Sequence, residues 1–108
     1  MARLSRQVMA YEHGAFDATL AAAAGQDREL VVELRAAFAD SVSRHLDLLR
    51  RSRCDGNWAV VAQRLKGLAA GFHASELIAL ADEAIAAAPG EPAVVRRIAD
   101  FRDRFIAG

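Results

Sequence analysis

The sequence is dominated by stretches in which apolar residues recur every three or four positions. The longest such stretch covers residues 27–53, and its apolar positions are Val31, Leu34, Phe38, Val42, Leu46 and Leu49. Because an α-helix repeats every 3.6 residues, this spacing places all of these side chains on one helical face. A long helix with one apolar face has to bury that face against other elements, so the pattern predicts a packed helical domain.

Three further stretches follow the same pattern, and we expect helices over about residues 57–72, 75–88 and 91–107. In the stretch at 57–72 the inner positions are Trp58, Val61, Ala62, Leu65, Leu68, Ala69 and Phe72. In the stretch at 75–88 they are Leu77, Leu80, Ala81, Ala84 and Ala88, and in the stretch at 91–107 they are Val94, Ile98, Phe101 and Phe105. Gln26 or Asp27 can cap the helix at 27–53, and Asp55 or Asn57 can cap the helix at 57–72. Pro92 suits the first turn of the helix at 91–107. Short connections make neighbouring helices antiparallel. The expected fold is all-α, an antiparallel up-and-down four-helix bundle over residues 27–107.

An additional helical segment is expected over residues 1–25, as one helix or as two short ones broken near Gly14. Phe16, Leu20 and Tyr11 are its candidates for packing inward. With 108 residues, the chain is long enough for a single domain with one core.

The composition excludes several classes of function for this protein. The 14 basic and 14 acidic residues cancel, which argues against binding to nucleic acid or to an anionic membrane surface. No apolar run is long enough to span a membrane, and no signal peptide is recognised, so we expect a cytoplasmic protein. The single cysteine, Cys54, has no partner for a disulfide, and no His, Cys, Asp or Glu set has metal-ligand spacing. We expect neither a metal nor a cofactor.

The outer face of the helix at 57–72 is unusual. Each helical residue advances by about 100°, which places Gln63 about 160° from the centre of the apolar stripe. Small residues surround it, namely Ala59, Gly67 and Ala70, and Lys66 lies beside them. Glycine inside a helix costs about 1 kcal/mol relative to alanine, and such a loss often reflects close approach of another surface. The simpler interpretation is an alanine- and glycine-rich sequence with no partner.

The same residues resemble a known family. The segment Ala62-Gln63-Arg64-Leu65-Lys66-Gly67-Leu68-Ala69 is similar to the signature Ala-His-x-Leu-Lys-Gly-Ser-Ala of histidine phosphotransfer (HPt) domains. Asp55-Gly56-Asn57-Trp58 resembles the Asp-Trp entry into the active helix of that family, and the similarity covers about residues 27–88. It implies a four-helix bundle that docks on the receiver domains and histidine kinases of bacterial two-component systems.

The sequence departs from the family pattern at three positions. Gln63 stands where the family has its phosphorylated histidine, Leu68 where a small residue is common, and His73 near a glycine that usually ends the helix. The lone pair of the Gln63 amide is delocalised into the carbonyl, so it cannot attack a phosphoryl group as imidazole does. We expect His73 to have a structural role at the helix end, in the left-handed conformation that histidine tolerates.

The resemblance therefore implies a pseudo-HPt module that binds a receiver domain or a histidine kinase without phosphotransfer activity. The expected partner-binding residues form the outer face, which we define as Ala59, Gln63, Arg64, Lys66, Gly67 and Ala70. In the family, the matching lysine helps to neutralise phosphoryl oxygens and the matching glycine leaves room for an incoming loop. A local basic patch of Arg44, Arg50, Arg51, Arg53 and Arg64 could attract the acidic pocket of a receiver, or could simply be solvated.

Two other hypotheses remain open at this point. The first is an active phosphotransfer protein that uses another histidine, His45 or His73. The second is a structural or dimerising helical bundle unrelated to phosphorelay, since an exposed alanine-rich N-terminal helix could support a homodimer.

Overall fold

The structure, a computed structural model, describes residues 14–25, 27–52 and 54–108, and their regular structure is entirely helical. A first helix covers residues 14–24. Four more follow it: α2 (Arg28–Arg51), α3 (Asp55–Gly71), α4 (Ser75–Ala86) and α5 (Pro92–Ala107). No strand occurs in these ranges, which confirms the all-α prediction.

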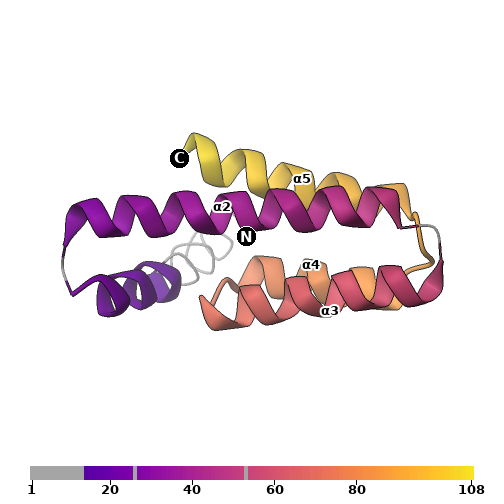
Figure 1. Cartoon of the computed structure of the whole chain (residues 1–108), viewed down its shortest axis with the longest axis horizontal. Helices are drawn as coiled ribbons and strands as arrows, with labels where there is room; N and C mark the ends of the chain where they lie inside the picture. Colours follow the sequence, from indigo (N-terminus) through magenta and orange to yellow (C-terminus); the bar gives the residue numbers. More distant parts are fainter. Residues whose placement is uncertain (1–13, 26, 53) are drawn as a thin grey trace, which may run out of the picture.

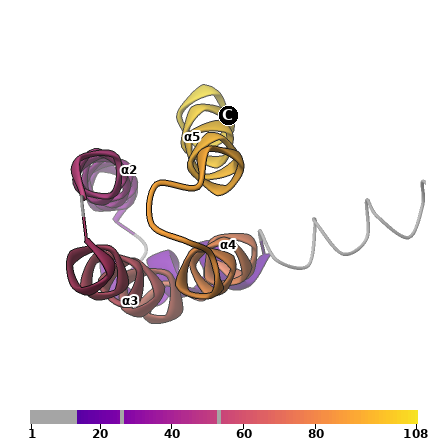
Figure 2. The same cartoon turned by 90° about the vertical axis from the view of Figure 1, so that its right-hand side faces the viewer.

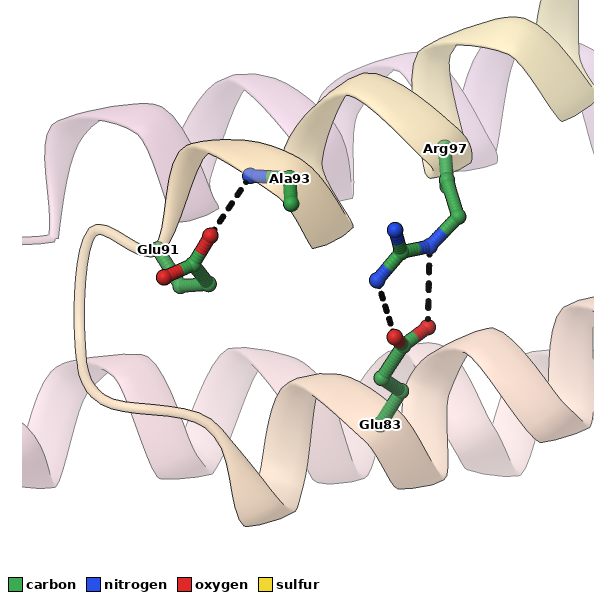
Figure 3. A network of polar contacts seen from close by, with 4 residues as sticks. All are labelled: Glu83, Glu91, Ala93 and Arg97. Carbon is green, nitrogen blue, oxygen red and sulfur yellow. Dashed lines mark hydrogen bonds and ion pairs between the residues drawn. The ribbon is translucent and has the colours of Figure 1, made fainter.

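Two of the predicted helix starts are confirmed by capping hydrogen bonds. The carboxylate of Asp27 accepts from the backbone N–H groups of Glu29 at 3.0 Å and Leu30 at 3.3 Å, which caps α2. Glu91 caps α5 by accepting from the N–H of Ala93 at 2.8 Å (Figure 3). Pro92 is the first residue of α5, where its missing N–H costs no helical hydrogen bond. The other candidate cap of α2, Gln26, lies outside the described residues.

The predicted start of α3 is wrong by two residues. The helix begins at Asp55 rather than at residue 57, and its N-cap is Cys54, whose side chain makes no capping hydrogen bond. Asp55 and Asn57 therefore lie inside the helix. Asp55 belongs to the first turn, where a negative charge is favourable next to the positive end of the helix dipole.

Helix α4 ends at Ala86, two residues earlier than the apolar pattern predicts. The indole Nε1 of Trp58 donates a hydrogen bond of 2.7 Å to the carbonyl oxygen of Ala84, and the N–H of Ala87 reaches the same oxygen at 3.2 Å. The side chain of Ala88, assigned above to the apolar stripe, is exposed because the helix has already ended.

The helices α2 to α5 contact one another in sequence, and α5 returns to contact α2. Viewed along the helices, the four occupy the corners of a square, with α2 above α3 and α5 above α4 (Figure 2). The helix at 14–24 lies beneath the N-terminal half of α2 in Figure 1. Two arginines of α5 bind carboxylates of α4: Arg97 pairs with Glu83 (Figure 3), and Arg104 lies 2.6 Å from Glu76. The hydrogen bond that Arg104 donates to Glu76 raises the pKa of Arg104 above its ordinary value.

The core lies between these helices and is built largely from their predicted inner positions. The largest fully buried side chains are Trp58, Phe38, Leu20, Leu46, Leu49, Leu65, Leu77, Ile98, Val42 and Val94. Several predicted inner residues are only partly buried and pack around this core: Val31, Leu34, Leu68, Phe72, Leu80, Phe101 and Phe105.

An aromatic cluster joins the first helix to the others. The ring centroid of Phe16 lies 5.0 Å from that of Phe38, 5.9 Å from that of Phe72 and 5.3 Å from that of Phe105. Phe16 and Leu20 are buried, as predicted. Gly14 is helical, and the third inward candidate, Tyr11, lies outside the described residues.

Candidate docking face on α3

One side of α3 is fixed to the core and the opposite side is open to solvent. Trp58, Val61, Ala62, Leu65 and Ala69 are buried, as the period predicted. The other side carries exposed residues of the outer face defined above: Ala59, Gln63, Arg64, Gly67 and Ala70. The structure thus places the Gln63 side chain on the surface, and the small residues Ala59, Gly67 and Ala70 near it are exposed as well.

None of the described residues fills the space beside Gly67. A Cβ atom built on Gly67 would meet no heavy atom of residues 14–25, 27–52 or 54–108 within 4 Å, apart from its own helix backbone and chain neighbours. Packing within the chain therefore does not require glycine at this helical position. An approaching surface is one physical reason for tolerating the helix-propensity cost of glycine, and the absence of selection against it is another.

Lys66 is placed differently from the rest of the outer face. Its side chain is 43% exposed, and its Nζ lies 2.8 Å from Oδ1 of Asp82 on α4, whose side chain is 52% exposed. The ammonium group is therefore turned toward α4 and has a carboxylate partner within the chain. Sequence reasoning missed Asp82, because no pattern in either helix states how α3 and α4 are aligned.

Arg64 is on the other side of Gln63 from Lys66. Helical geometry separates the directions of Arg64 and Lys66 by about 160°, so when Lys66 faces α4, Arg64 faces the α2 side. Within the ranges that the structure describes, no carboxylate forms an ion pair with Arg64. The side chain of Arg64 is therefore the more accessible cation of the two.

Val60 is an exposed apolar residue that sequence reasoning did not include. Its side chain is 50% exposed, and it lies three residues before Gln63 and seven before Gly67. Helical geometry puts it about 60° from Gln63 and about 20° from Gly67, so it belongs to the same side of α3. The helical-wheel arithmetic that singled out Gln63 could also have found Val60.

Both candidate histidines are held by hydrogen bonds. Nδ1 of His45, which is half-buried, lies 2.6 Å from the carbonyl oxygen of Ser41, and this oxygen can only accept. The exposed His73 has a φ of 55°, which confirms the predicted left-handed conformation. Its Nδ1 lies 2.9 Å from Oγ1 of Thr19, whose hydroxyl donates to the carbonyl of Ala15. In His45 Nδ1 therefore carries a proton, and Nε2 holds the lone pair of the neutral form.

The basic residues do not form one uniform patch. Arg44, Arg50, Arg51 and Arg64 are exposed, but Arg51 lies 2.9 Å from Asp47 on its own helix. Arg53 lies outside the described residues. Pairing of Arg51 with Asp47 reduces the net positive charge near the end of α2.

The described residues contain no group of three or more His, Cys, Asp or Glu side chains arranged to hold a metal ion. Cys54 is exposed as a free thiol. Among the helices in the described ranges, none combines the length and apolar character needed to cross a membrane. Comparison of the chain with models of protein families, with curated proteins and with solved structures found no match.

Proposed function

We propose that this protein is a pseudo-HPt module, which docks on a receiver domain or a histidine kinase of a bacterial two-component system and does not itself carry phosphate. In this proposal α2 to α5 form an antiparallel up-and-down four-helix bundle, and the protein acts in the cytoplasm. The observation that carries the proposal is the exposed Gln63 side chain on α3, flanked by exposed Ala59, Gly67 and Ala70.

The chemistry of Gln63 supports binding rather than transfer. Phosphorelay requires a nitrogen lone pair that attacks a phosphoryl group and later releases it, and an amide nitrogen offers no such lone pair. A glutamine still has hydrogen-bond donors and an acceptor, so it can contact a partner at the same position. Occupying a receiver or a kinase in this way would inhibit it, sequester it or hold it in an assembly.

A binding screen tests the proposal directly. The full chain is titrated against the receiver domains and histidine kinases of the source organism, and at least one receiver or kinase is expected to bind. The matched variants are Ala59→Arg and Ala70→Arg, which place bulky side chains on the outer face, and Ala88→Arg, an exposed position after the end of α4. The first two should weaken binding and the third should not. Recovery of neither receivers nor kinases would favour a structural or dimerising role.

Replacement of the glutamine gives a second test. Gln63→His puts an imidazole at an exposed position of α3, so this variant should accept phosphate from a phosphorylated receiver that binds the wild-type chain. The wild-type chain should take up no label in the same assay. Acid-labile label on the wild-type chain that disappears in His45→Gln or His73→Gln would support the active-phosphotransfer hypothesis instead. If a bound receiver transfers nothing to Gln63→His, the outer face is not the surface that it contacts.

A further inference from the structure

The ion pair between Lys66 and Asp82 connects the outer face of α3 to α4. Lys66 Nζ lies 2.8 Å from Asp82 Oδ1, and both side chains are about half exposed. The pair is therefore within reach of a partner that covers Gln63, because Lys66 is only three residues from Gln63 along the helix.

The charges of the outer face are consequently unequal on its two sides. On the α2 side, Arg64 has no ion-pair partner in the described part of the chain. On the α4 side, the charge of Lys66 is balanced by Asp82. A partner that brings carboxylates to the face meets one accessible cation and one that is already paired.

We propose that Asp82 acts as an internal competitor for Lys66, and so lowers the affinity of the outer face for acidic groups on a receiver domain. This inference rests on the proposed function. In the free protein Asp82 holds the ammonium group toward α4. On docking, the acidic pocket of the receiver competes with Asp82 for the same ammonium group, and the carboxylate of Asp82 repels the incoming acidic groups. Removal of the Asp82 charge makes Lys66 available and removes that repulsion.

The size of the effect follows from the exposure of the pair. Exposed ion pairs contribute little because water and salt screen them, and their measured range corresponds to about a 1.5-fold to fivefold change in an equilibrium constant. Asp82→Asn is therefore expected to tighten receiver binding by about twofold to fivefold at low salt. The gain should shrink as salt rises, because the screening length falls to about 8 Å at physiological ionic strength.

Glu83→Gln is the matched control. It makes the same change in charge at the next position of α4, but Glu83 pairs with Arg97 on α5 and not with Lys66 (Figure 3). The affinity of this variant is expected to lie within about 1.5-fold of wild type, because Lys66 keeps its partner. Any effect of net charge alone would appear equally in both variants. Asp82→Asn in a Lys66→Gln background should give a smaller gain, because only the repulsion between Asp82 and the incoming acidic groups is then removed.

The experiment is an isothermal titration of an unphosphorylated receiver into the full chain and these variants. Circular dichroism and thermal midpoints establish that each variant is folded. Equal affinities of Asp82→Asn and Glu83→Gln, or an undiminished gain in the Lys66→Gln background, would overturn the role of Asp82 while leaving docking intact. If the wild-type chain and Asp82→Asn bind no receiver at all, the role of Asp82 in receiver docking fails together with the receiver arm of the proposed function.

Discussion

Gly67→Ala should make the protein more stable and at the same time a weaker binder. Gly67 lies in the interior of α3 and is exposed, and a Cβ atom added there would meet no heavy atom of the described residues within 4 Å. Alanine at this position gains helix propensity and loses less conformational entropy on folding than glycine. No steric cost offsets these gains.

The expected gain in the free energy of unfolding is about 0.5–1 kcal/mol, the range for glycine against alanine in an exposed helix interior. For a domain of this size, a change of about 1 kcal/mol raises the thermal midpoint by roughly 4 °C. Urea denaturation followed by circular dichroism measures the change directly. A stability equal to or lower than that of the wild type would show that the space around Gly67 is not as open as the structure indicates.

The same variant tests the docking surface. If a receiver approaches the backbone of α3 at Gly67, the added methyl group meets the partner, and the affinity should fall several-fold although the protein is more stable. Gly14→Ala is the control for binding, because Gly14 is exposed, belongs to the helix at 14–24, and an added Cβ atom would meet no heavy atom of the described residues within 4 Å. Unchanged receiver affinity in a stabilised Gly67→Ala protein would refute the idea that this glycine leaves room for a partner.

Two further predictions concern the packing that positions α3. Trp58→Phe removes the hydrogen bond from the indole to Ala84 and leaves a small cavity, so urea denaturation should show a loss of about 2 kcal/mol. A loss below about 0.5 kcal/mol would mean that this hydrogen bond does not tie α3 to the end of α4. Phe16→Ala removes a ring that lies 5.0 Å from Phe38 and 5.3 Å from Phe105, and should cost about 3 kcal/mol in the same assay. A change of less than about 1 kcal/mol would show that the helix at 14–24 contributes little to the stability of the domain.

The sequence predicted those features of a helix that depend only on residues close together in the chain. The apolar period of α2 marked Phe38, Val42, Leu46 and Leu49, all of which are buried. Asp27 caps α2 because its side chain reaches N–H groups only two and three residues ahead. Such contacts depend on neighbours in the chain, so they are readable without a tertiary structure.

One error in the predicted helix bounds lies at the end of α4. The apolar pattern of α4 continues to Ala88, yet the helix ends at Ala86. The carbonyl of Ala84, near this end, accepts a hydrogen bond from Trp58, which is 26 residues earlier in the chain. That hydrogen bond satisfies a carbonyl of the last turn. Pro89 follows this end, and the residue before a proline is disfavoured in the α conformation, so apolar periodicity alone overestimates the length of the helix.

For the candidate site, the sequence by itself determined which residues of α3 face outward, because the period of one helix fixes the direction of every side chain relative to its buried stripe. Gln63 and Gly67 are therefore exposed as predicted. Only the tertiary structure decided the charge at the edge of that face, since the pairing of Lys66 with Asp82 depends on how α3 and α4 are aligned. Ion pairs between helices require distances of a few ångströms across elements, and the periodicity of the separate helices does not specify their relative register.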